Sequence, residues 1–190
     1  DLLYSNMYLI IEGVHSIVID PSPNVELAKD LKVDYIILTH EHYDHISGVN
    51  IWKEVTSAPV LCSKLCSENI KDPRKNFARH FKEFCMLQTW VKLNKIPEID
   101  TEYLCFADEW FENEFNLIWQ KHKLKLFEIP GHSQGSIGIL LDNKYFFSGD
   151  SLIKDNEVEF RMPGGSLKKW KDIGCKRINE IPNGTEVFPG

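Results

Sequence analysis

The heptapeptide Thr39-His40-Glu41-His42-Tyr43-Asp44-His45 closes the apolar run Asp34–Thr39 and places three imidazoles and a carboxylate within six positions. If the run is a strand, the side chains of His40 and His42 point the same way, because a strand repeats every two residues. Asp44 and His45 then lie where the chain turns, so they can face a second point beside the first. Neutral histidine nitrogen and aspartate oxygen suit zinc and related transition metals. The stretch therefore predicts two ligand pairs directed at adjacent points, as a two-metal centre requires.

His-x-His-x-Asp-His at the end of a strand resembles the signature of the metallo-β-lactamase superfamily. The alternative is a solvated histidine-rich turn, and the test is whether further ligands follow in the family's order. Two such elements do follow. Pro130-Gly131-His132-Ser133 resembles the element whose histidine completes the nitrogen ligands of the first metal. Ser148-Gly149-Asp150 resembles the element whose aspartate bridges both metals.

The resemblance implies six metal ligands in two groups, namely His40, His42 and His132 for the first metal, Asp44 and His45 for the second, and Asp150 as the bridge. It names Asp44 and Asp150 as the catalytic residues. It implies two zinc ions as the cofactor, with iron or manganese as alternatives. Two such ions lie about 3.5–4 Å apart and lower the pKa of a shared water to about 7. A metal-bound hydroxide then attacks the substrate, and no serine or cysteine nucleophile is needed.

Length and composition favour one soluble globular domain that spans residues 1–190, with 43% apolar and 26% charged residues. The net charge of −6 argues against general attraction to nucleic acid phosphates. No apolar run approaches the roughly 20 residues that a membrane-spanning helix needs. We therefore expect a small-molecule substrate, and neither a nucleic acid partner nor a membrane.

Five cysteines leave one unpaired under any disulfide scheme, and this odd number favours free thiols in the reducing cytoplasm. Cys62 and Cys66 have a metal-pair spacing. However, the sequence pattern predicts a helix in this segment, and no second cysteine pair accompanies it. Both observations disfavour a zinc site there.

The order of the predicted elements indicates a layered α/β fold. Strands are expected at 8–12, 16–20, 34–39, 59–61, 124–129, 137–141, 144–147 and 185–188, and helices at 25–31, 46–55, 63–70 and 167–180. This alternation alone predicts only the α/β class. The resemblance adds a four-layer αβ/βα sandwich, with the metal site at one edge between two sheets.

An aromatic stripe at mostly helical spacing lies in the region 71–100, with Phe77, His80, Phe81, Phe84 and Met86 followed by Trp90. Such stripes are usually packed on the body of a protein. A long connection also often carries binding function, so the region is a candidate lid over the metal cleft. Both interpretations stay open. His15, His80 and His122 stand outside the motifs and are not expected to be ligands.

Two later segments match the family only in part. The segment Glu159–Ser166 resembles a Gly-Arg-x-Asp-x-Pro-Gly-Gly loop, but Phe160 replaces the first glycine and the spacing is shorter. Pro189-Gly190 resembles the closing Pro-Gly-His element without its histidine. We therefore expect a domain truncated at the C-terminus, with one strong metal position and one weak position.

The leading functional hypothesis is a metal-dependent hydrolase of small esters or thioesters that resembles glyoxalase II (hydroxyacylglutathione hydrolase). Against a true glyoxalase II, the 190 residues are not expected to include the C-terminal helical region of that enzyme. The alternatives are a lactonase or β-lactamase-type amide hydrolase, a phosphodiesterase, and a catalytically inert metal-binding module. An electron-transfer relative of the flavodiiron proteins is disfavoured, because those carry glutamate where this chain has His42.

Overall fold

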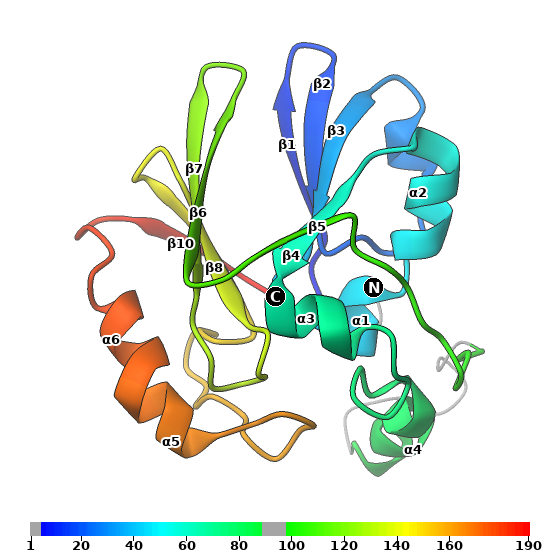
Figure 1. The fold of residues 1–190 in the computed structure, drawn as a ribbon, viewed down its shortest axis with the longest axis vertical. Coiled ribbons are helices and arrows are strands. Elements are labelled where there is room, and N and C mark those ends of the chain that lie inside the picture. The colour runs from blue at the N-terminus through cyan, green and yellow to red at the C-terminus, as the bar shows by residue number, and fades with distance from the viewer. Residues whose placement is uncertain (1–4, 89–97) are drawn as a thin grey trace.

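Two five-stranded sheets lie face to face, and helices cover the outer face of each (Figure 1). The structure is a computed structural model that describes residues 5–88 and 98–190. The strand order is β1-β2-β3-β4-β5 in the first sheet and β10-β9-β8-β7-β6 in the second. The four-layer sandwich expected from the resemblance is thereby confirmed.

Residues 8–111 supply the strands of the first sheet, and residues 114–189 supply those of the second. The first sheet contains β1 (Tyr8–Glu12), β2 (His15–Ile19), β3 (Lys32–Ile37), β4 (Val60–Ser63) and β5 (Glu109–Phe111). The second contains β6 (Glu114–Trp119), β7 (His122–Glu128), β8 (Ile137–Leu141), β9 (Tyr145–Gly149) and β10 (Glu186–Pro189). Strands β2 to β5 pair in parallel, β1 pairs antiparallel to β2, and β10 lies parallel to β9. Both sheets are therefore mixed, and β5 and β6 were not predicted from the sequence.

The helices are shorter than the sequence pattern predicts. They are η2 (Glu26–Ala28), α1 (Tyr43–Ile46), α2 (Val49–Thr56), α3 (Lys64–Asn69), α4 (Ala78–Leu87), α5 (Leu167–Lys169), η4 (Trp170–Gly174) and α6 (Cys175–Ile178). The expected helix 46–55 is interrupted because the Gly48 N–H donates to the carbonyl of Pro21, at 2.9 Å. The expected helix 167–180 contains a π-helical turn, η4, and ends at Ile178. No helix in the described part of the chain has the length and apolar character needed to cross a bilayer.

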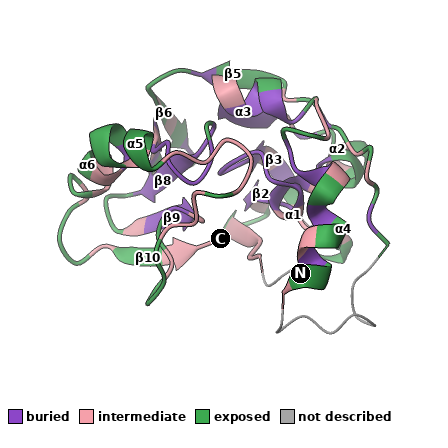
Figure 2. Cartoon of the chain, turned by 90° about the horizontal axis from the view of Figure 1, so that it is seen from below, coloured by how far each residue is buried: buried purple, intermediate pink, exposed green. Residues whose placement is uncertain are grey.

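Alternation along the strands separates the apolar core into an inner layer and outer layers. Figure 2 shows that strands such as β2 and β8 are largely buried, whereas α5 is exposed. Ile17, Ile19 and Ile37 face the second sheet, where they pack with Leu126 and Ile139. Residues of β2 and β3 with the opposite orientation pack under α1 and α2. Strands fixed on both faces in this way hold their ends rigidly, and the candidate site lies at the end of β3.

Polar side chains join the β1–β2 and β6–β7 hairpins to each other and to the turn between β8 and β9. We call Glu12, Lys121, His122 and Asp142 the inter-sheet clasp. Glu12 of the first sheet accepts from Lys121 Nζ at 2.6 Å and contacts His122 Nε2 at 3.3 Å. The other nitrogen of His122, Nδ1, lies 2.6 Å from Asp142 Oδ2. Because the two carboxylates flank one imidazole, the clasp is strongest when His122 is charged.

We expect this clasp to give the stability of the protein a measurable pH dependence. The hydrogen bond to Asp142 raises the pKa of His122, and that to Lys121 lowers the pKa of Glu12. The histidine contribution is complete below its unfolded pKa of about 6.5 and disappears as the pH rises through the higher folded pKa. The Glu12 contribution is present above its unfolded pKa of about 4.3 and is lost as the pH falls through the lower folded value.

Denaturant unfolding of the wild type and of His122→Gln, in chelator and across pH, checks this expectation. The stability difference between the two should be largest near pH 5–6 and should shrink toward both ends of the range. His80→Gln is the matched control, because His80 is exposed on α4. A wild-type advantage that stays constant from pH 4 to pH 9 would contradict the clasp.

Candidate metal centre

His40 and His42 lie just beyond β3, in the chain that leads to α1. His42 has extended backbone angles and immediately precedes the helix, so Asp44 and His45 fall in its first turn. The side chains of His40, His42 and His45 are all buried. The strand and the helical turn therefore present this motif inward, as the spacing predicts, and not as a solvated surface turn.

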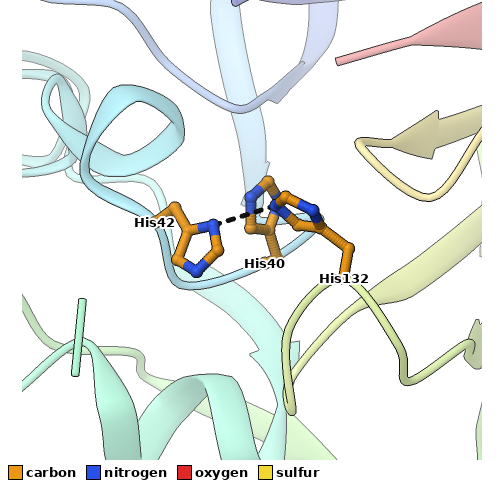
Figure 3. A group of neighbouring side chains, drawn as sticks. All are labelled: His40, His42 and His132. Atoms are coloured by element: carbon orange, nitrogen blue, oxygen red, sulfur yellow. Dashed lines mark hydrogen bonds between the residues drawn. The ribbon is translucent and has the colours of Figure 1, made fainter. Parts of the chain in front are cut away.

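His132 reaches the same point from the segment between β7 and β8 (Figure 3). The ligand atoms of His40, His42 and His132 all lie within 4.8 Å of one another. Nδ1 of His42 is 3.0 Å from Nε2 of His132. We call these three residues the three-histidine group. The structure brings them together, and their role as ligands stays a prediction.

Each ring of the three-histidine group donates its N–H away from the shared point. His42 Nε2 donates to the carbonyl of Pro163 and His132 Nδ1 donates to that of Glu159, both at 3.0 Å. His40 Nδ1 lies 3.0 Å from Thr39 Oγ1, and Nε2 of His40 has no hydrogen-bond partner among the described residues. Three unprotonated nitrogens therefore face one another.

Burial lowers the pKa of all three imidazoles, and this favours the neutral form that binds metals. Neutral rings whose N–H groups are already used cannot donate hydrogen bonds to one another. Three converging lone pairs instead fit a divalent cation with nitrogen ligands, such as zinc. The donor set present in this chain thus fits the metal that the resemblance implies.

Asp44, His45 and Asp150 form a second group beside the first. Nε2 of His45 lies 3.8 Å from Asp44 Oδ2 and 3.4 Å from Asp150 Oδ1. The other oxygen of Asp150 lies 3.6 Å from Nε2 of His132. Asp150 thus stands between the two groups, where the resemblance places the bridging carboxylate.

The electrostatics of the second group are those of a carboxylate cluster. Burial raises the pKa of Asp44, and the neighbouring charge of Asp150 adds to the effect. Burial also works against the charged form of Asp150, but His45 outweighs it and holds the pKa of Asp150 well below its usual range. The pKa of His45 is lowered by burial but raised more by Asp44, Asp150 and Asp20 together. A cation at this point would meet concentrated negative charge.

Asp20 is a buried partner of this centre that the sequence analysis missed. It accepts from the Thr39 N–H at 2.7 Å, from the Thr39 hydroxyl at 2.5 Å and from His45 Nδ1 at 2.8 Å. Asp20 also helps to orient His40, because the Thr39 hydroxyl contacts both side chains. Its ligand atom lies within 4.8 Å of those of His40 and His45. Because both carboxylate oxygens are used, we interpret Asp20 as the residue that orients these two imidazoles.

β10 brings the last residue of the chain to the second group. The Gly190 N–H donates to the carbonyl of Gly149 at 2.9 Å, which places it next to Asp150. A Cβ atom on Gly190 would lie 2.4 Å from Asp150 Oδ1 and 2.7 Å from His45 Cε1. A larger residue at this position would require the side chains of Asp150 and His45 to shift. The two-site asymmetry expected from the sequence stays a prediction.

The aromatic stripe packs next to the three-histidine group. The ring of Phe77 lies 6.1 Å from that of His42, and Phe81 packs on Tyr43 at 5.2 Å. Met162, from the loop that holds His42, contacts the same cluster. Phe77 and Phe81 are buried, which fits packing, while Trp90 lies outside the described residues. The lid stays a prediction.

The remaining histidines and the cysteines lie elsewhere. His15 pairs with Asp34, His122 belongs to the inter-sheet clasp, and His80 is exposed on α4. All five cysteines are free, and Cys62 and Cys66 are buried beneath the helices of the first sheet.

Comparison with known proteins agrees with the resemblance found in the sequence motifs. The profile of the metallo-beta-lactamase superfamily matches residues 1–172. A hydroxyacylglutathione hydrolase of Pelagibacter ubique (strain HTCC1062) is 32% identical over 196 residues, which cover 96% of this chain and 64% of that protein. Against three hydroxyacylglutathione hydrolases, this chain spans between 56% and 64% of their length.

Two crystal structures share the fold. The BLEG-1 B3 metallo-beta-lactamase aligns with a TM-score of 0.79 at 23% identity, and TTHA1623 in a di-iron-bound form aligns with a TM-score of 0.74 at 26% identity. Each alignment covers 98% of this chain and 86% of the other. The chain therefore belongs to the metallo-β-lactamase superfamily, and its buried histidine and aspartate site is that of a metallo-hydrolase of this superfamily.

Proposed function

We propose that the protein hydrolyses small esters or thioesters with the help of two divalent metal ions. The observation that carries the proposal is the convergence of three unprotonated imidazole nitrogens beside the Asp44, His45 and Asp150 group. The Pelagibacter relative, named hydroxyacylglutathione hydrolase, supports thioesters as the first class to test.

In the proposed reaction, the residues of this chain hold the metal ions, orient the reacting groups and move protons. His40, His42 and His132 would hold the first ion, and Asp44 and His45 the second, with Asp150 shared. When bound, such ions supply an activated water and polarise the carbonyl group. Asp44, whose Oδ2 lies 3.8 Å from His45 Nε2, would take up a proton and return it to the leaving group. Asp150, whose pKa His45 holds well below its usual range, would keep its negative charge between the two metal positions.

Zinc is the proposed metal, because neutral imidazole and carboxylate oxygen make up its usual ligands. Iron suits the same donors, and TTHA1623 was solved with two irons. Manganese remains the third candidate. We also propose a small-molecule substrate and a reducing compartment such as the cytoplasm, which the five free cysteines support.

A substrate panel on metal-loaded protein tests the proposal. Thioesters and simple esters should be turned over faster than lactones, β-lactams or a phosphodiester, and a chelator should abolish turnover until metal is restored. Preference for lactones or β-lactams would replace the proposed class with the amide or lactone alternative. Absence of turnover with every substrate would point to an inert metal-binding module.

A further inference from the structure

Glu41 is a fully buried carboxylate that lies between the two segments carrying the three-histidine group. Its Oε1 accepts from Asn69 Nδ2 at 2.9 Å. Its Oε2 accepts from the Ser133 hydroxyl at 2.8 Å and from the Gly135 N–H at 3.1 Å. Glu41 follows His40 in the chain, and Ser133 follows His132, so one carboxylate connects both ligand-bearing segments.

The fit around Glu41 is close on every side. A Cβ atom at Gly135 would lie 2.6 Å from Glu41 Oε2 and 2.5 Å from the backbone nitrogen of Cys66. Ser63 holds the same segment through its hydroxyl, which donates to the Gly135 carbonyl at 2.7 Å. Both carboxylate oxygens thus accept hydrogen bonds from neutral donors, and Glu41 belongs to neither candidate metal-binding group of the described residues.

The charge of Glu41 has no cationic partner. Among the described residues, no lysine, arginine or histidine lies within ion-pair distance of it. A buried charge held only by neutral groups carries a large desolvation cost. The residues next to its contacts in the chain are the imidazoles of the three-histidine group, which burial keeps neutral. A cation at the three-histidine group would therefore supply positive charge that the side chains in contact with Glu41 do not.

We infer that Glu41 is a positioning residue whose buried negative charge is compensated by the metal at the three-histidine group. In the metal-free protein this charge costs stability, and in the metal-loaded protein it strengthens metal binding without contact. The inference rests on the metal centre of the proposed function and is independent of the substrate class.

Glu41→Gln tests this directly, because glutamine keeps the shape and removes the charge. Zinc affinity is measured by competition with a chromophoric chelator, and thermal unfolding is followed in chelator and in excess zinc. We expect zinc to bind about 10–100-fold more weakly, as for partners of metal ligands elsewhere. In chelator the variant should be less stable than the wild type, because a glutamine amide nitrogen cannot accept from the Ser133 hydroxyl and the Gly135 N–H. Its gain in unfolding temperature on addition of zinc should also be smaller than that of the wild type. Glu68→Gln is the matched control, since Glu68 is exposed on α3 next to Asn69.

A second variant separates charge from hydrogen bonding. Ser133→Ala removes one donor to Glu41 and leaves the charge, so it should lower stability with or without metal and weaken zinc binding far less than Glu41→Gln. Equal loss of zinc affinity in both variants would overturn the charge argument. Unchanged zinc affinity in Glu41→Gln, or a zinc-induced gain in unfolding temperature equal to that of the wild type, would overturn it as well.

The cobalt-loaded protein supplies a further readout. The visible spectrum of bound Co²⁺ should keep its band pattern in Glu41→Gln, because the ligands themselves are unchanged. A shifted band pattern would instead make Glu41 a ligand and overturn the inference. If wild-type protein bound neither zinc nor cobalt, the proposed function would fail with it. Normal wild-type binding with an unaffected variant would reject only the role of Glu41.

Discussion

His132→Ala is expected to lose the metal at the three-histidine group and to lower hydrolysis by more than about a hundredfold. Altering a mere partner of a metal ligand costs about 10–100-fold, and removal of a ligand should exceed that. His132 is also the one member of the group that comes from the second sheet. Metal content after gel filtration and the rate of thioester hydrolysis check the prediction together.

The control for this change is His80→Ala on the exposed face of α4, which should keep both metal content and rate. Retained metal and retained turnover in His132→Ala would show that this histidine is not a ligand. The second group, Asp44, His45 and Asp150, is intact in the variant, so any metal that remains bound should depend on those residues.

Asp20→Asn is expected to weaken metal binding about 10–100-fold and to destabilise the fold by about 1–3 kcal/mol. Asp20 accepts three hydrogen bonds in the interior, and an amide nitrogen cannot accept the ones from Thr39 Oγ1 or His45 Nδ1. Both His40 and His45 would lose their fixed orientation. Zinc competition and denaturant unfolding measure the two effects.

Asparagine is the appropriate substitute here because Asp20 has a φ of 51°, in the left-handed region that asparagine tolerates. The backbone should therefore stay unstrained, and the loss can be assigned to the side chain. Asp30→Asn, at an exposed position, is the control. A variant of Asp20 that binds zinc as tightly as the wild type would remove its orienting role.

The six candidate ligands could be proposed from sequence because four of them occur in one short stretch and the other two lie in short elements of their own. The role of Asp20 could not be proposed from sequence, because a single acidic residue after an apolar strand is common. Its partner His45 is also 25 positions away. The sequence does not indicate the role of Glu41 either, because an acidic residue between two histidines is normally expected to be exposed to solvent. Only the packing of Ser133 and Gly135 against it shows that it is buried.

The fold was predictable where pattern and length agree, as in β3 and β8. The strand β5 was not predictable, because its three residues form a strand only by pairing with β4. β6 does alternate, with Phe115, Leu117 and Trp119 less exposed than their neighbours, so this strand could have been found. The break in the expected helix 46–55 accompanies a tertiary contact, Gly48 against Pro21, which no local pattern encodes.

The residues of the candidate metal centre lie far apart in the sequence. This separation determines when the centre can form during folding. His42 meets a ring 90 positions later and a carbonyl 121 positions later, so no early segment can hold a metal tightly on its own. Contacts of such separation form late, because the intervening chain must first be ordered. Metal uptake thus follows the docking of the two halves. A refolding chain should collapse at the same rate with or without zinc, while zinc slows only the return to the unfolded state.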